Sequence, residues 1–191
     1  MKKLLLMAIA LFTMNAVNAQ IGDQIKQSRD RAAKLEKLTT DYKSSGIGQI
    51  DGYGNDIKAA AIFAMENSVK LENLYKREIG EVVDGVQDVT VTKPNFEDWE
   101  SLALSVAKEA KSIKDAVDKA KDAADAAKKE ADNVASEKNP MKKAKAAKNA
   151  KAAAAVIEFG NAATPILLEE SAAQVKAIDE IMKTLKAGKN L

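Results

Sequence analysis

Six lysines within fourteen residues form the densest group of chemically active side chains in this chain. They are Lys138, Lys142, Lys143, Lys145, Lys148 and Lys151, and no acidic residue lies among them. Such a run can bind phosphate, nucleic acid or an anionic surface such as lipopolysaccharide, or it can be a solvated face that neutralises an acidic helix beside it. No aromatic residue is interleaved for base stacking, which disfavours nucleic acid. The candidate anionic-surface residues are Lys142, Lys143, Lys145, Lys148 and Lys151.

A glycine-rich segment with nearby acidic and amide side chains could suggest a phosphate or calcium site, but its spacing fits neither. The glycines do not match G-x-G-x-x-G and no P-loop lysine follows them. The polar residues lack the alternating spacing and the bidentate glutamate of an EF-hand. The sequence therefore predicts a connecting loop over residues 44–55. The residues concerned are Gly46, Gly48, Asp51, Gly52, Gly54, Asn55 and Asp56.

Side chains suited to catalysis or metal binding are scarce. The chain has no histidine and no cysteine, which removes histidine bases, the commonest zinc ligand and disulfides. Glu169 and Glu170 are adjacent, so on a helix they point about 100° apart, and we interpret both as solvated. Aromatic residues make up only 4% of the chain, leaving few large side chains to line a pocket. We expect a non-enzymatic protein without cofactor or metal.

The first nineteen residues have the pattern of a cleaved signal peptide. Lys2 and Lys3 precede an apolar stretch, and small residues end it at Val17, Asn18 and Ala19. This stretch is about half of the roughly 20 apolar residues that span a bilayer, and no later stretch could span one. We therefore expect export to the periplasm or the extracellular space, with processing before Gln20.

Net charge also argues against a dedicated nucleic-acid protein. The formal net charge is +2, and Lys2 and Lys3 are the only charged residues of the signal segment, so residues 20–191 carry no net charge. A nucleic-acid-binding domain usually has a basic excess. The expected partners are another protein or a second copy of the chain, with no specific nucleic acid, no transmembrane span and, as an alternative, peripheral contact with a membrane.

Apolar residues recur every seven positions from Trp99 to Val134, in two interleaved series. This pattern predicts one long helix with a seam that faces a partner helix over about five heptads. Asn95 is suited to cap its start, and Pro140 to begin the next helix. The first series is Trp99, Val106, Ile113, Ala120, Ala127 and Val134, and the second is Ala103, Ala110, Val117, Ala124 and Ala131.

Three further helices are expected at about residues 21–43, 55–78 and 140–187. In the last, the apolar stripe changes face from Val156 to Leu168 and Val175, and Pro165 should kink or break the helix at 162–165. Folding back at Pro140 would set seven acidic residues of 115–137 beside the six lysines. The prediction is a mostly α, elongated bundle with a coiled-coil hairpin, two shorter and two long helices, and residues 20–191 as one domain.

A valine-rich segment interrupts the helical pattern. Its β-branched residues and the Asp84-Gly85 turn predict a small β-hairpin at about 81–92. With the aromatic residues that follow, it is the candidate partner-binding surface, because an exposed strand edge can accept another strand. The alternative for the tryptophan is a core position in the heptad pattern. The candidate residues are Val86, Val89, Val91, Phe96 and Trp99.

Two functions remain open at this point. The first is an exported structural or interaction protein, such as a component of an envelope, secretion, pilus or adhesion assembly. The alternative is a periplasmic chaperone-like or lipid-binding helical protein, whose alanine-rich hairpin opens and offers its apolar stripe to a client.

Overall fold

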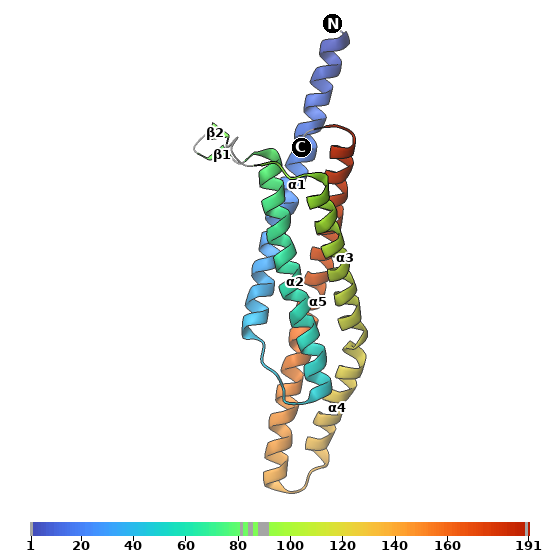
Figure 1. The fold of residues 1–191 in the computed structure, drawn as a ribbon. Coiled ribbons are helices and arrows are strands. Elements are labelled where there is room, and N and C mark those ends of the chain that lie inside the picture. The colour runs from blue at the N-terminus through green and yellow to red at the C-terminus, as the bar shows by residue number, and fades with distance from the viewer. Residues whose placement is uncertain (1, 81, 84–85, 88–91, 190) are drawn as a thin grey trace.

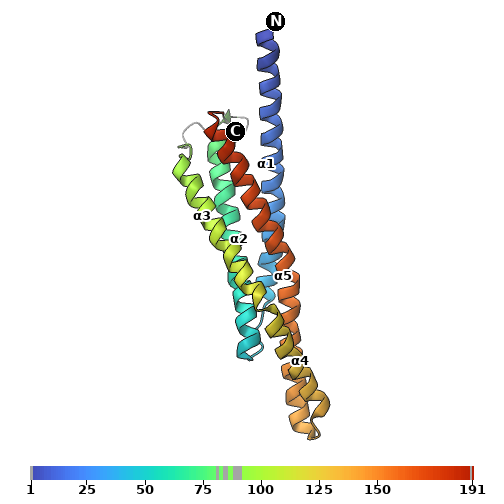
Figure 2. The same cartoon turned by 90° about the vertical axis from the view of Figure 1, so that its right-hand side faces the viewer.

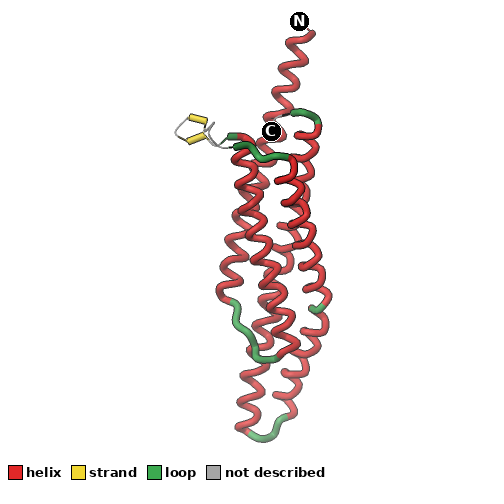
Figure 3. The backbone as a smooth tube through the Cα atoms, in the orientation of Figure 1, coloured by secondary structure: helices red, strands yellow, loops and turns green. Residues whose placement is uncertain are grey.

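The computed structural model describes the backbone of residues 2–80, 82–83, 86–87, 92–189 and 191, and the side chains of 20–80, 92–189 and 191. Most of this backbone is helical (Figures 1 and 3). In the described part, no helix is both long and apolar enough to cross a membrane. The elements are α1 (Lys2–Asp41), α2 (Gly48–Ile79), β1 (Val82–Val83), β2 (Val86–Gln87), α3 (Phe96–Asp118), α4 (Ala120–Ser136) and α5 (Pro140–Lys186).

The helices form an elongated antiparallel bundle, which confirms the predicted fold class. Helices α1, α2, α3 and α5 run alternately down and up its long axis, and both chain ends lie at the same end (Figures 1 and 2). Helices α2 and α5 contact each other and both outer helices. At the opposite end, α4 and the first part of α5 continue as a two-helix hairpin beyond the loop that joins α1 to α2 (Figure 2).

Helix α1 passes without interruption through the predicted cleavage site between Ala19 and Gln20. Its first part projects past the end of the bundle in two perpendicular views (Figures 1 and 2). Among the described side chains, Ile21 is the first buried one. After that site, α1 contributes Ile21, Ile25 and Leu35 to the core.

The long helix predicted from the heptads is divided at Lys119 into α3 and α4, and α4 ends at Ser136 as expected. Asn95 caps α3 in a capping box with Asp98, each side chain accepting from the other residue's backbone N–H at 2.9 Å. At Lys119 the backbone N–H donates to Ala116 and its carbonyl accepts from Ala123, both at 3.1 Å. The break is thus a local turn within one rod.

The register of the heptad seam differs from the prediction. Trp99, Val106 and Ile113 of the first series are buried, but Ala124 and Ala131 of the second are exposed. The second buried series lies one residue before the predicted second series. Because it contains a glutamate, a pattern of apolar residues alone does not detect it. That series is Leu102, Glu109, Ala116 and Ala123.

The predicted change of face in the last helix is wrong for the same reason. Helix α5 is continuous through Pro165, so the alternative of a break there is also wrong. Leu168 and Val175, expected on its apolar stripe, are 52% and 50% exposed. Buried polar residues continue the original stripe instead. They are Glu170, Ser171 and Gln174.

The predicted loop over residues 44–55 is mostly helix, because α2 already begins at Gly48. The Asp51 carboxylate accepts hydrogen bonds from the backbone N–H groups of Ser45 (2.6 Å) and Gly46 (2.8 Å), which closes the turn before the helix. Gly46 has a φ of +81°, which suits glycine. Gly54 is a packing residue, since a Cβ atom there would lie 2.6 Å from the Tyr42 hydroxyl.

Two apolar clusters fill the bundle. The cluster near the α1–α2 loop includes Leu35, Ile57 and Leu167, and the cluster near the chain ends includes Ile21, Trp99 and Ile181. In each of α1, α2, α3 and α5, the buried residues that lie between the two clusters are polar. The bundle therefore has a polar layer across its middle.

Strands β1 and β2 pair antiparallel at the place predicted for the hairpin, with Val82 opposite Gln87 and Val83 opposite Val86. They lie to the side of the end of α2 (Figure 1). The predicted Asp84-Gly85 turn and residues 88–91 lie outside the described residues.

Candidate functional site

The strongest concentration of one charge lies at the far end of the α4–α5 hairpin. Residues 128–151, here called the basic tip, contain eight lysines and three acidic residues, a net charge of +5. Because residues 20–191 are neutral as a whole, the rest of that span carries −5. The lysines are Lys128, Lys129, Lys138, Lys142, Lys143, Lys145, Lys148 and Lys151, and all are exposed.

The structure shows no close ion pair between the tip lysines and the acidic residues of α4. Helices α4 and α5 do pack side by side. Within the described residues, however, no ion pair involves the basic tip. Asp122, Asp125 and Asp132 are exposed, whereas α4 packs through other positions such as the buried Ala123. The eight tip lysines are thus exposed and make no ion pair among the described residues.

Local hydrogen bonds fix the turn at the apex of the tip. The Asn139 side chain accepts from the backbone N–H of Met141 (3.0 Å) and of Lys142 (3.3 Å), and Pro140 occupies the first turn of α5. The Glu137 carboxylate accepts from the Asn139 N–H at 2.8 Å. This arrangement leaves the Met141 side chain 85% exposed at the apex.

A polar groove separates the two helices of the tip. Lys142 and Lys145 line it from α5, and Glu130 lines it from α4. The lysines can bind an anion there, while the Glu130 carboxylate opposes that binding. The remaining lining residues are Asn133, Ser136, Glu137, Ala146 and Asn149.

The second predicted surface is only partly described. Val86 lies in β2, while Val89 and Val91 are outside the described residues. Phe96, the first residue of α3, is half-buried, with the Lys186 ammonium 5.0 Å from its ring centroid. Trp99 is 0% exposed within the core cluster near the chain ends. Trp99 is therefore a core residue here and presents no surface to a partner.

The polar layer of the bundle is centred on Glu170, which the sequence led us to interpret as solvated. It is 0% exposed. Its carboxylate accepts from Arg31 Nε at 2.6 Å, Ser68 Oγ at 2.7 Å and Gln174 Nε2 at 2.8 Å, and also from the Ser28 hydroxyl. Three helices thus meet at one buried carboxylate. Its neighbour Glu169 is exposed and pairs with Arg31 at 3.3 Å.

Glu109 brings α3 into the same layer. It is 0% exposed and accepts from Asn67 Nδ2 at 2.7 Å, and Ser105 Oγ donates to the Asn67 amide oxygen at 2.7 Å. Burial raises its pKa to about 7; the Asn67 bond opposes this shift and the nearby Glu170 charge adds to it. In the sequence, Glu109 and Glu170 stand at the helical spacing of the buried apolar residues. A pattern that counts only apolar residues does not include them.

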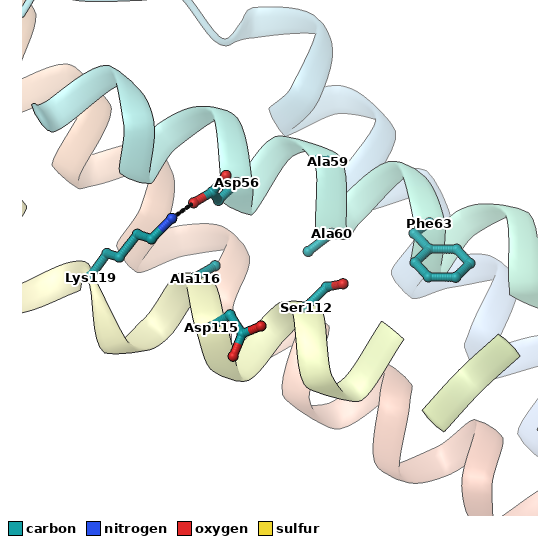
Figure 4. A pocket seen from close by; sticks show the side chains of 8 residues that line it. All are labelled: Asp56, Ala59, Ala60, Phe63, Ser112, Asp115, Ala116 and Lys119. Carbon is teal, nitrogen blue, oxygen red and sulfur yellow. Dashed lines mark hydrogen bonds and ion pairs between the residues drawn. The ribbon is translucent and has the colours of Figure 1, made fainter. Parts of the chain in front are cut away.

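A further group of polar side chains lines an open hollow between α2 and α3 (Figure 4). The Asp56 carboxylate and the Lys119 ammonium pair at 2.5 Å, which ties the α3–α4 break to α2. The Ser112 hydroxyl donates to the Lys108 carbonyl at 3.1 Å. Asp115 also lines this hollow. Within the described residues, no group of three carboxylates could hold a metal ion.

No protein-family model, curated protein sequence or solved structure matches this chain.

Proposed function

We propose that this chain is an exported, non-enzymatic interaction protein of the cell envelope. The four-helix part is the rigid support, and the projecting α4–α5 hairpin is the part that meets a partner. The expected location is the periplasm or the cell exterior, after removal of residues 1–19.

The observation that carries this proposal is the combination of shape and unpaired charge at the basic tip. The hairpin extends beyond the other helices (Figure 2), its lysines are exposed, and no ion pair among the described residues engages them. Exposed charge that the fold leaves unpaired favours association with a complementary surface.

The test is capture of envelope components by the purified protein at near-physiological salt. We expect specific components with the wild-type protein and their loss when Lys142, Lys143 and Lys145 are all changed to Glu. The matched control reverses three exposed α3 lysines, Lys108, Lys111 and Lys114, and should retain capture. Equal capture by all three proteins would contradict the proposal.

A further inference from the structure

The arrangement of lysines around the basic tip favours a flat surface met end-on over a partner that lies along one side. Lys142, Lys145, Lys148 and Lys151 follow each other at intervals of three residues. At about 100° per residue, consecutive members are turned by about 60° around α5. The four lysines therefore span about half of the circumference of α5. A rod-shaped partner alongside the hairpin could contact only part of this spiral, whereas a plane across the apex can reach the first lysines together.

The apex also carries an exposed apolar group. Met141 is 85% exposed, and Lys138, Lys142 and Lys143 surround it in the sequence, all exposed. An exposed apolar side chain with exposed lysines next to it in the sequence matches the boundary between lipid acyl chains and anionic headgroups. The groove between the two helices of the tip is less suited to an anion, because the Glu130 and Glu137 carboxylates line it together with Lys142 and Lys145.

The distribution of charge along the rod would orient this contact. The tip carries +5 and the remainder of residues 20–191 carries −5. A negatively charged surface therefore attracts one end of the molecule and repels the rest.

Building on the proposed function, we infer that the basic tip binds end-on to a membrane surface that contains anionic lipids. Lipid phosphates pair with Lys138, Lys142, Lys143 and Lys145, and Met141 enters the interface between headgroups. The body of the bundle then stands away from the membrane.

The experiment measures co-sedimentation of the protein, as recovered after export, with two kinds of vesicle. One kind is phosphatidylcholine alone, and the other contains about 30% phosphatidylglycerol to supply anionic headgroups. We expect binding only to the second kind, with a steep fall as salt is raised. The Lys142→Glu, Lys143→Glu, Lys145→Glu variant should bind at least about tenfold more weakly.

Two matched controls separate the tip from general charge and hydrophobicity. Reversing Lys108, Lys111 and Lys114 changes net charge equally and should weaken binding less than about twofold. Met141→Ala should weaken binding, whereas Leu104→Ala, at a site that is 65% exposed on α3, should not. Circular dichroism checks that every variant keeps its helix content.

The outcomes distinguish this inference from the proposed function. Equal losses in the tip and α3 variants, or equal binding to both vesicle kinds, would overturn end-on recognition of anionic lipid. Absence of vesicle binding would also overturn it. If the tip variant still loses its envelope component in that case, the proposed function stands with an acidic protein as partner. If it keeps the component, both proposals fall.

Discussion

At the scale of single residues, the buried carboxyl group of Glu109 links the stability of the bundle to pH. Its pKa is about 7, above its ordinary value of 4.5, chiefly because burial disfavours the charged form. The folded chain therefore binds more protons at this site than the unfolded chain between those two pH values. The contribution of Glu109 to stability is complete below about pH 4.5 and is lost as pH rises through about 7.

Replacing Glu109 with Gln should remove this dependence. Gln keeps the shape and can still accept the bond from Asn67 without carrying charge. We expect the variant to exceed the wild type in free energy of unfolding by about 1 to 3 kcal/mol at pH 8, with little difference near pH 4.5. Urea unfolding at several pH values measures it. A constant difference between the two proteins across that range would contradict the assignment.

Glu72 supplies a control of opposite sign. Its pKa is lowered, mainly by hydrogen bonds from Arg29. Its stabilising contribution is therefore present above its ordinary pKa and is lost as pH falls through the lowered value. Glu72→Gln should reduce stability at neutral pH and have least effect in acid.

Glycine 160 permits close contact between α5 and α2. A Cβ atom there would lie 2.1 Å from the Tyr53 hydroxyl oxygen, so Gly160→Ala must displace the ring and should cost about 1 to 3 kcal/mol of stability. Gly52 is a matched helical glycine with nothing within 4 Å of such an atom, and Gly52→Ala should stabilise by about 0.5 to 1 kcal/mol. Thermal unfolding of both variants tests the pair; equal shifts would show that Tyr53 does not pack as described.

At the scale of elements, the register of α4 against its neighbours rests on one alanine. Ala123 is 0% exposed, whereas Ala124 is exposed. Ala123→Leu should overpack the core and destabilise by about 1 to 3 kcal/mol, while Ala124→Leu should change stability by less than about 0.5 kcal/mol. Chemical denaturation of the two variants measures their free energies of unfolding. A larger loss of stability for Ala124→Leu than for Ala123→Leu would favour the seam predicted from the sequence.

Helix existence and fold class were predictable because long 3–4 periodicity is a strong signal. The cap at Asn95 and the turn before Pro140 were predictable from local chemistry as well. The errors share one cause, which is that a pattern of apolar residues cannot include buried polar ones. Because Glu109 is buried in the seam and Glu170 in the α5 stripe, the apolar pattern placed both faces incorrectly.

The residues of the candidate site were predictable from the sequence, but whether they form ion pairs was not. The sequence identified the lysines from Lys142 to Lys151, yet it left open whether acidic residues neutralise them. That depends on which way each side chain faces once α4 and α5 are packed. A one-residue error in register turns a helical side chain by about 100°. The absence of ion pairs among the described tip residues could therefore be seen only in the folded structure.

At the scale of the whole molecule, the bundle is a rod with one end marked by charge and the other by both chain ends (Figure 1). Export should remove residues 1–19 and leave the core residues of α1 after them, Ile21, Ile25 and Leu35, in the mature chain. Intact-mass measurement of the exported protein should place the N-terminus within two residues of Gln20. A retained N-terminus would contradict the export model and imply an anchored protein.

The most direct test of the central claim, that the basic tip is the contact surface, is site-specific photocrosslinking in intact cells. A photoreactive residue replaces Lys143 at the tip or Lys111 on α3, both exposed. Covalent adducts to envelope protein or lipid should form from position 143 and be weak or absent from position 111. Adducts from position 111 with none from position 143 would show that the side of the rod, and not its tip, meets the partner.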